Sequence, residues 1–284
     1  DTRLDAIRAA VECGVNFIDT APAYNNGVAE RFVGKAVKEM GVRDKVIIAT
    51  KCGNDFINGA YVRNGSRDNI LRECEESLRN LQTDHIDLYL IHWPDVKVPF
   101  QETMEALTLL KEQGKVLHVG VSNFSQAQME EAGQYCPIEA YQPQYSMVHR
   151  DDEPLIRWAA EQGMGVMTYG SLGGGILTGA FREPRTFAPS DSRNRFYKHF
   201  QEPTFSKVME LLKVMDGFSA EHGVPLSQIA LNWCAGKDFV SSCIVGAQTR
   251  AKVEENLAAS GRTASHFGWL NLAEDWCGYS GNTF

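Results

Sequence analysis

Four side chains that can donate, accept or stabilise a proton stand at or just beyond the ends of short apolar runs. They are Asp19, Tyr24, Lys51 and His92. A carboxylate, a phenol, an ammonium and an imidazole are groups that general acid–base catalysis uses. Taken singly, each has a structural explanation as a buried ion-pair member, a loop aromatic or a core histidine. The four together at successive strand ends favour a catalytic site.

The apolar runs before these residues are typical of buried parallel strands. The first contains the β-formers Val15, Phe17 and Ile18 between Gly14 and Pro22. Strands are predicted at residues 15–19, 46–51, 86–92, 116–123, 137–144, 165–170 and 239–245. Since these strands alternate with helical patterns and end in polar residues, the sequence predicts a (β/α)8 barrel. The four side chains would then converge at the carboxyl ends of its strands.

The intervening segments have helical periodicity. Helices are predicted at residues 4–13, 29–40, 68–81, 102–113, 125–134, 153–161, 204–222 and 226–235, and from Arg250 onward. Residues 52–65 form a polar loop that is expected to shape substrate access, and residues 171–203 form a long irregular segment. Seven strands are counted where a closed barrel needs eight. Because the chain begins on a helix, the first strand is expected upstream of residue 1.

Composition predicts a single acidic domain over residues 1–284. The chain is 43% hydrophobic and 23% charged, with a net charge of -8 that argues against a nucleic-acid partner. Its seven cysteines have no metal-ligand spacing and predict reduced thiols in a cytoplasmic protein. No apolar stretch approaches the roughly 20 residues of a membrane span. The oligomeric state is left open.

Five motifs in order resemble the signatures of the aldo-keto reductases, including the bacterial and potassium-channel β-subunit branches. The motifs are Asp19-Thr20-Ala21-Pro22-Ala23-Tyr24, Thr50-Lys51, Leu88-Tyr89-Leu90-Ile91-His92-Trp93-Pro94, Gly120-Val121-Ser122-Asn123-Phe124, and Gly246-Ala247 with Glu255-Asn256. The resemblance covers nearly the whole chain. It implies an NAD(P)H-dependent carbonyl reductase whose catalytic tetrad is filled by Asp19, Tyr24, Lys51 and His92.

This chemistry suits the four residue types. Reduction of a carbonyl by hydride leaves negative charge on its oxygen, so a proton donor must stand within hydrogen-bond reach. Tyr24 is the expected donor, and Lys51 is expected to lower its pKa from about 10 by stabilising the phenolate. Asp19 would hold Lys51 in its charged form, and His92 would polarise or orient the carbonyl.

The resemblance also implies which residues contact the cofactor. Ser122, Asn123 and Gln142 match positions that bind the nicotinamide carboxamide, and Tyr169 matches an aromatic that stacks on the ring. Ser171, Leu172 and Gly174 resemble pyrophosphate contacts. The adenosine phosphate is assigned to residues of the last motif and its surroundings: Gly246, Gln248, Arg250, Lys252, Glu255 and Asn256.

The adenosine region departs from the family pattern. Gln248 stands where many relatives have Lys or Arg, and Lys252 stands where a Gln is usual. Arg250 or Lys252 is expected to take over a 2′-phosphate, so NADP(H) is predicted in preference to NAD(H). No G-x-G-x-x-G follows the first strand, so a Rossmann domain is not supported.

Three alternatives stay open. A Schiff-base lyase or isomerase would use Lys51 as a neutral amine, which the adjacent Asp19 disfavours. A potassium-channel β-subunit-like protein would keep the fold and tetrad but act chiefly as a binding partner. A degenerate member would have lost the cofactor.

The substrate is expected to be a small aldehyde, ketone or sugar. Candidate pocket aromatics are Phe56, Tyr61, Trp93, Trp269, Trp276 and Tyr279, the last three in a divergent tail over about residues 261–284. The sequence does not choose among these substrates.

Overall fold

The computed structural model describes residues 2–57, 60–189, 191 and 193–259. The divergent tail, with Trp269, Trp276 and Tyr279, lies outside these residues. Contacts divide the chain into two compact units. The first comprises Asp1–Gln142, Glu161–Gly165 and Ala247–Val253, and the second comprises Pro143–Ala160, Val166–Gly246 and Glu254–Phe284. The expectation of one domain over residues 1–284 stays a prediction.

The first unit is built on a parallel sheet with the order β1-β2-β5-β6-β7. Its strands are β1 (Phe17–Asp19), β2 (Ile47–Cys52), β5 (Ile86–Ile91), β6 (Val116–Ser122) and β7 (Ala140–Gln142). Asp19 is in register with Ala49 of β2, so Lys51 lies two residues farther along that strand. Since residues two apart share a face of a strand, this register places Lys51 on the face of Ala49.

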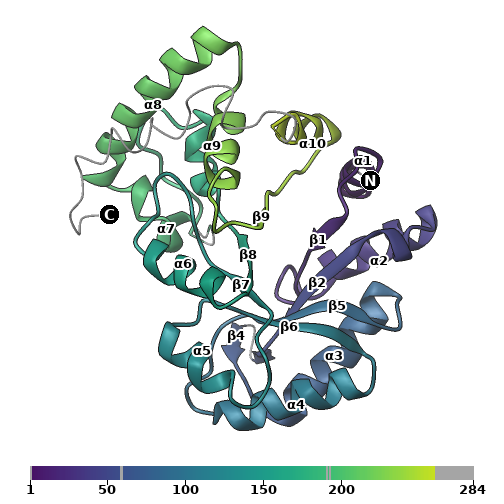
Figure 1. Cartoon of the computed structure of the whole chain (residues 1–284). Helices are drawn as coiled ribbons and strands as arrows, with labels where there is room; N and C mark the ends of the chain where they lie inside the picture. The colour runs from purple at the N-terminus through teal and green to yellow at the C-terminus, as the bar shows by residue number, and fades with distance from the viewer. Residues whose placement is uncertain (1, 58–59, 190, 192, 260–284) are drawn as a thin grey trace. The chain divides into compact units, whose positions relative to one another are not determined.

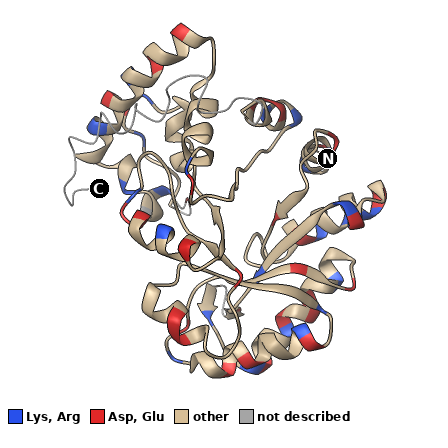
Figure 2. Cartoon of the chain, in the orientation of Figure 1, with Lys and Arg blue, Asp and Glu red and all other residues tan. Residues whose placement is uncertain are grey.

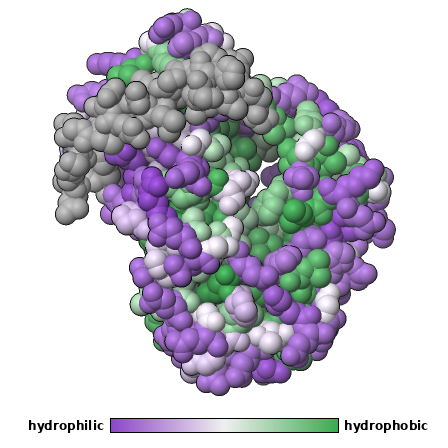
Figure 3. All heavy atoms as spheres, viewed as in Figure 1, coloured by the Kyte–Doolittle hydropathy of each residue, from purple (hydrophilic) through white to green (hydrophobic). Residues whose placement is uncertain are grey.

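One α-helix precedes these strands, and four α-helices and a short 3-10 helix lie between them. They are α1 (Thr2–Glu12), α2 (Val28–Met40), η1 (Arg43–Lys45), α3 (Arg67–Leu81), α4 (Phe100–Glu112) and α5 (Gln126–Ala132). Figure 1 shows α2, α3 and α4 along one side of the sheet. Charged residues of this unit gather on these helices rather than on the strands (Figure 2), and the space-filling view is mostly hydrophilic over them (Figure 3). The helices therefore bury their apolar faces against the strands, as amphipathic helices do.

Close packing of α2 on α3 depends on Gly34. A Cβ at Gly34 would lie 2.4 Å from the carbonyl oxygen of Leu81. Only a residue without a side chain allows this approach, since backbone atoms cannot yield as a flexible side chain can. The helix positions are thus set by a specific contact as well as by apolar burial.

The segment predicted as a loop over residues 52–65 instead contains an antiparallel hairpin. Its strands are β3 (Asn54–Ile57) and β4 (Ala60–Arg63), which pair Asn54 with Arg63 and Phe56 with Tyr61. Phe56 and Tyr61 are β-formers, and their rings lie 4.9 Å apart. Cross-strand aromatic pairs of this kind stabilise a hairpin. The loop prediction gave too much weight to the polar residues between them.

The remaining elements lie mostly in the second unit. They are α6 (Glu153–Glu161), β8 (Gly165–Thr168), η2 (Gly173–Thr178), α7 (Arg193–Phe196), η3 (Lys198–Phe200), α8 (Thr204–His222), α9 (Leu226–Ala235), β9 (Ser242–Cys243) and α10 (Arg250–Leu257). The parallel strands β8 and β9 pair Thr168 with Cys243. The helices α6, α8 and α9 have the predicted bounds, whereas β9 is much shorter than predicted.

The long segment after β8 is not wholly irregular, because it contains η2, α7 and η3. An edge-to-face cluster of Phe181, Phe187 and Phe200 organises it, with ring centroids 5.0 to 5.7 Å apart. Aromatic pairs in such geometry add stability beyond their buried area. No helix within residues 2–57, 60–189 and 193–259 has the length and apolarity to cross a lipid bilayer.

Candidate active site

Lys51 and Asp19 form a buried ion pair at the ends of β1 and β2. The Lys51 ammonium lies 2.7 Å from Asp19 Oδ1 and donates a further hydrogen bond of 2.8 Å to the Thr20 carbonyl. The Lys51 side chain is 1% exposed and that of Asp19 6%. Burial is the largest single effect and would lower the pKa of Lys51, but the charges of Asp19 and Tyr24 and the hydrogen bonds to both together outweigh it, and the pKa lies above its usual value. Lys51 is therefore an ammonium at neutral pH.

Tyr24 stands over this ammonium in the turn that follows β1. Lys51 Nζ donates to the Tyr24 hydroxyl at 3.4 Å and lies 5.0 Å from the centre of its ring. The residue is 43% exposed, although its hydroxyl points toward buried Lys51. Burial of the hydroxyl raises the pKa of Tyr24, and the Lys51 charge opposes that rise without cancelling it. Lys51 thus lowers the pKa of Tyr24 as predicted, but the net pKa is raised because desolvation of the phenolate is the larger effect.

His92 directly follows β5, and its backbone N–H donates to the Cys52 carbonyl. Its ring is perpendicular to that of Tyr24, with centroids 6.1 Å apart. Burial, with the charge of Lys51, lowers the pKa of His92 to about 3. The imidazole is therefore neutral at physiological pH and keeps one N–H to donate.

The structure thus brings together all four side chains that the sequence placed at strand ends. Three come from the carboxyl ends of neighbouring parallel strands, and Tyr24 comes from the adjoining turn. The arrangement offers a phenol, a fixed positive charge beneath it and a neutral hydrogen-bond donor beside it.

Ser122, Asn123 and Gln142 extend this cluster along the same sheet edge. Gln142 Nε2 donates to Asp19 Oδ2 at 2.8 Å, so Asp19 joins Gln142 to Lys51. Ser122 Oγ donates to the Gln142 carbonyl, and Asn123 Nδ2 donates to the His92 carbonyl. Asn123 has a φ of 61°, a left-handed conformation that asparagine tolerates better than most residues.

Tyr169, Ser171, Leu172 and Gly174 follow β8 in the second unit. The backbone N–H of Tyr169 donates to the Pro143 carbonyl, and Ser171 Oγ lies 3.3 Å from Thr168 Oγ1. Gly174 has a φ of 64°, and a Cβ there would lie 3.1 Å from the Tyr197 ring. Packing of Tyr197 is thus one reason for a glycine at this position.

The residues assigned to the adenosine phosphate are divided between the units. Gln248, Arg250 and Lys252 belong to the first, whereas Gly246, Glu255 and Asn256 belong to the second. Glu255 accepts a hydrogen bond from Ser227, and Asn256 is buried.

Arg250 is engaged within its own unit. Its guanidinium contacts Asp5 at 2.9 Å and Glu12 at 2.8 Å, both on α1. A cation expected to meet a phosphate is thus already paired with two carboxylates, and its assignment stays a prediction.

Two hairpin residues approach the tetrad in ways that the sequence did not reveal. Asn54 Nδ2 lies 3.3 Å from His92 Nδ1. The Tyr61 hydroxyl donates to the Pro22 carbonyl and accepts from the Asn26 backbone, on either side of Tyr24. The available signal was two pairs of β-formers, Phe56-Ile57 and Tyr61-Val62, on either side of Asn-Gly in the sequence.

Comparison with known proteins identifies the family. The model of the aldo/keto reductase family matches residues 1–266. The chain is 39% identical to the aldo-keto reductase YhdN of Bacillus subtilis over 255 residues, 89% of this chain and 77% of that protein. The chain belongs to the aldo/keto reductase family. It is therefore an oxidoreductase that acts on carbonyl compounds.

Other aldo/keto reductases that it resembles differ in what their names state. An NADH-specific methylglyoxal reductase of Escherichia coli is 32% identical over 90% of this chain and 82% of that protein. A probable voltage-gated potassium channel subunit beta of Arabidopsis thaliana is 33% identical over 87% of this chain and 78% of that protein. The solved glycerol dehydrogenase of Gluconobacter oxydans is 30% identical and matches 99% of this chain and 86% of its own, with a TM-score of 0.89. This match confirms the predicted fold class, an α/β barrel.

Aldo/keto reductases use NAD(P)H, and the residues of this reductase fit such a group. Ser122 and Gln142 are 1% and 2% exposed, so polar side chains are buried beside the tetrad. With Asn123 they provide a hydroxyl and two amides, which both donate and accept hydrogen bonds as a carboxamide requires.

Proposed function

We propose that this aldo/keto reductase reduces the carbonyl group of aldehydes, ketones or sugars to the alcohol, with Tyr24 as the general acid. The observation that carries the proposal is the contact of the Tyr24 hydroxyl with the buried, ion-paired Lys51. A phenol with a raised pKa is protonated at neutral pH. It can therefore give its proton to the oxygen on which negative charge develops.

The other tetrad members would support that transfer. Lys51 stabilises the phenolate that remains after the proton has left, and Asp19 keeps Lys51 charged and in place. Neutral His92 donates a hydrogen bond to the carbonyl oxygen, which favours the developing charge. Ser122, Asn123 and Gln142 would hold the nicotinamide carboxamide. A reduced nicotinamide, when bound, supplies the hydride.

NADPH is proposed as the preferred cofactor, as the basic residues of the Gly246 region predict. A 2′-phosphate carries roughly two negative charges and is best met by a cation. We assign this contact to Arg250 or Lys252, of which Arg250 also pairs with Asp5 and Glu12. A relative in Escherichia coli is named as NADH-specific, so the preference of this chain has to be measured.

A Tyr24→Phe variant tests the proposed reaction. It removes the transferable proton and leaves the ring, so carbonyl reduction should fall by at least ~10²-fold while nucleotide binding persists. Turnover is measured with aldehydes, ketones and aldoses in the presence of NADPH or NADH, and with polyols in the presence of NADP+ or NAD+. Binding is measured by nicotinamide fluorescence. Tyr135→Phe, a change at an exposed tyrosine, is the matched control. A folded Tyr24→Phe enzyme with full turnover would eliminate Tyr24 as the acid.

A regulatory function is the second candidate, since relatives from Arabidopsis thaliana and Oryza sativa are named as probable potassium-channel subunits beta. Such a protein would turn over small carbonyls weakly and bind a channel. Assembly state, channel binding and turnover, measured on the same preparation, distinguish the two functions.

A further inference from the structure

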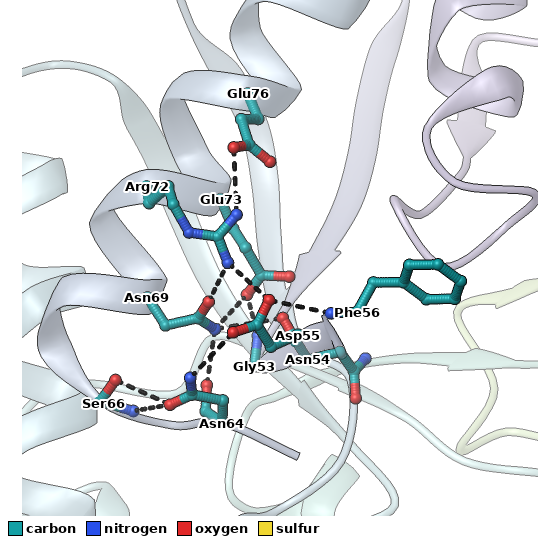
Figure 4. Close-up of polar contacts among 10 residues, drawn as sticks. All are labelled: Gly53, Asn54, Asp55, Phe56, Asn64, Ser66, Asn69, Arg72, Glu73 and Glu76. Carbon is teal, nitrogen blue, oxygen red and sulfur yellow. Dashed lines mark hydrogen bonds and ion pairs between the residues drawn. The ribbon is translucent and has the colours of Figure 1, made fainter. Parts of the chain in front are cut away.

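A polar cluster on α3 holds the hairpin that lies next to His92. Figure 4 shows Asn69, Arg72 and Glu73, all from α3, directed toward the residues that begin and end the hairpin. The part that matters here is Glu73, Asn69 and the Gly53–Asn54 backbone, which we call the Glu73 brace. None of its members belongs to the tetrad.

Glu73 anchors the brace from a buried position. Its residue is 6% exposed, and Oε2 accepts hydrogen bonds from Gly53 N at 2.7 Å and Asn69 Nδ2 at 2.9 Å. Burial raises the pKa of Glu73 to about 8. The brace is therefore largely uncharged at neutral pH and gives the neighbouring imidazole no anion that would favour its charged form.

Asn69 fastens both strands of the hairpin at once. Its Nδ2, whose two hydrogens are shared with Glu73, lies 3.1 Å from the carbonyl oxygen of Asn54, at the start of β3, and 2.8 Å from that of Asn64, just after β4. With Gly53 held by Glu73, the backbone of Asn54 is fixed on both sides. Its side chain is thus presented to His92 by a rigid support.

The contact with Asn54 decides which nitrogen of His92 carries the proton. An amide nitrogen is a donor only, so His92 Nδ1, 3.3 Å from Asn54 Nδ2, must be the acceptor. A neutral imidazole then has its single proton on Nε2. We propose that Asn54 is a positioning residue, held by the Glu73 brace, that fixes His92 as the Nε2–H tautomer so that it can donate to the substrate carbonyl.

This inference rests on the proposed carbonyl reduction, but its first test requires no turnover. In ¹⁵N-histidine-labelled protein, proton–nitrogen correlation spectra distinguish the two neutral tautomers. His92 is assigned among the seven histidines by the loss of its signals in His92→Gln. The expected result is an unprotonated Nδ1 and a protonated Nε2 in the wild type. A proton on Nδ1 would overturn the proposal even if Tyr24→Phe confirms the reaction.

Asn54→Asp gives a sharper second test. A carboxylate accepts and cannot donate, so it favours a proton on Nδ1 and raises the pKa of His92, against the opposing charge of Lys51. The kcat should fall about 10- to 100-fold, and nucleotide affinity should not change. The pH profile of kcat/KM should show an additional ionisation, that of His92, near neutral pH. Asn54→Ala should give a mixture of tautomers and a smaller loss.

Asn64→Asp is the matched control, because it makes the same chemical change in the same cluster at a residue whose side chain contacts Ser66 and Asp55. It should leave the His92 tautomer as in the wild type. An unchanged tautomer in a folded Asn54→Asp protein would refute the proposal. If Asn54→Asp does not fold, the wild-type spectrum still decides.

Discussion

Buried Lys51 and half-buried His92 are two bases at the ends of neighbouring strands, and their surroundings drive them to opposite charge states. The pKa of Lys51 is raised, whereas that of His92 is lowered to about 3. Burial disfavours the cation in both cases. The difference lies in the partner, since Lys51 faces the carboxylate of Asp19 and His92 faces the amide of Asn54.

The comparison shows how one pocket can hold a fixed cation and a neutral donor side by side. The proposed reduction needs both, because the phenolate of Tyr24 would require a positive neighbour and the carbonyl an N–H donor. The charge on Lys51 also contributes to the low pKa of His92. The charged half of the site thus helps to keep the other half neutral.

Replacement of Lys51, the cation beneath Tyr24, should have the largest effect on turnover. In Lys51→Met, kcat should fall by about 10³-fold, within the range of general acid–base contributions. Because Lys51 lowers the pKa of Tyr24 against the effect of burial, its loss raises that pKa further. Residual alcohol oxidation, which needs the phenolate, should therefore require a higher pH than in the wild type. Steady-state pH profiles in both directions measure the shift.

Lys45→Met is the control for this variant, because Lys45 is exposed and lies at the other end of β2. Its profile should match the wild type. Capture of a substrate adduct on Lys51 by borohydride would instead support a Schiff-base mechanism.

Removal of the Asp19 carboxylate should lower the pKa of Lys51, as burial already lowers that of His92. In Asp19→Asn, burial is no longer outweighed, so the pKa of Lys51 should fall and its amine should become neutral nearer physiological pH. Turnover should drop by about 10²-fold. Amine-reactive labelling followed by mass spectrometry measures the pH at which Lys51 reacts.

Asp87→Asn removes a carboxylate paired with Arg43 near the start of β5 and serves as the control. It should leave the labelling pH of Lys51 unchanged. Identical labelling of Lys51 in Asp19→Asn and the wild type would refute the proposed counter-ion effect.

Glu73 extends the comparison to a buried acid without a strong cationic partner. Its pKa is about 8 in the folded chain and about 4.5 in the unfolded one, so the folded state binds more protons between these values. Stability contributed by the neutral carboxyl is therefore complete below pH 4.5 and is lost as the pH rises toward 8. Glu73→Gln should be stabilised relative to the wild type by up to a few kcal/mol at pH 8, at about 1.4 kcal/mol per pKa unit.

Urea denaturation of both proteins across this pH range measures the difference in the free energy of unfolding. Glu76→Gln, one turn along α3 at an exposed carboxyl, should show no such trend. A constant difference between wild type and Glu73→Gln would contradict the raised pKa.

Arg250 is a cation paired with carboxylates at the surface, where we expect the smallest effect of a substitution. Its charge is held by Asp5 and Glu12, but its side chain is 39% exposed, so solvent screens the pairs. Whichever of Arg250→Ala and Lys252→Ala removes the 2′-phosphate contact should raise the dissociation constant for NADPH by about tenfold and leave that for NADH unchanged. Equal affinity of the wild type for both nucleotides would refute the NADPH preference.

The sequence by itself determined the strand ends and therefore the tetrad. An apolar run stops where a strand leaves the core, so Asp19, Lys51 and His92 could be placed at one edge of a parallel sheet without coordinates. Helical periodicity likewise gave the bounds of α6, α8 and α9. These features are local, since each depends on residues within one segment.

Only the tertiary structure decided the partners and charge states. Asn54 and His92 are separated by 38 positions, and Asn69 and Asn54 by 15. No local pattern reports the distance between them. Burial of the Tyr24 hydroxyl, the raised pKa of Glu73 and the pairing of Arg250 with α1 are equally invisible in the sequence. The physical reason is that desolvation and hydrogen bonding depend on what lies within a few ångströms in space, which folding alone determines.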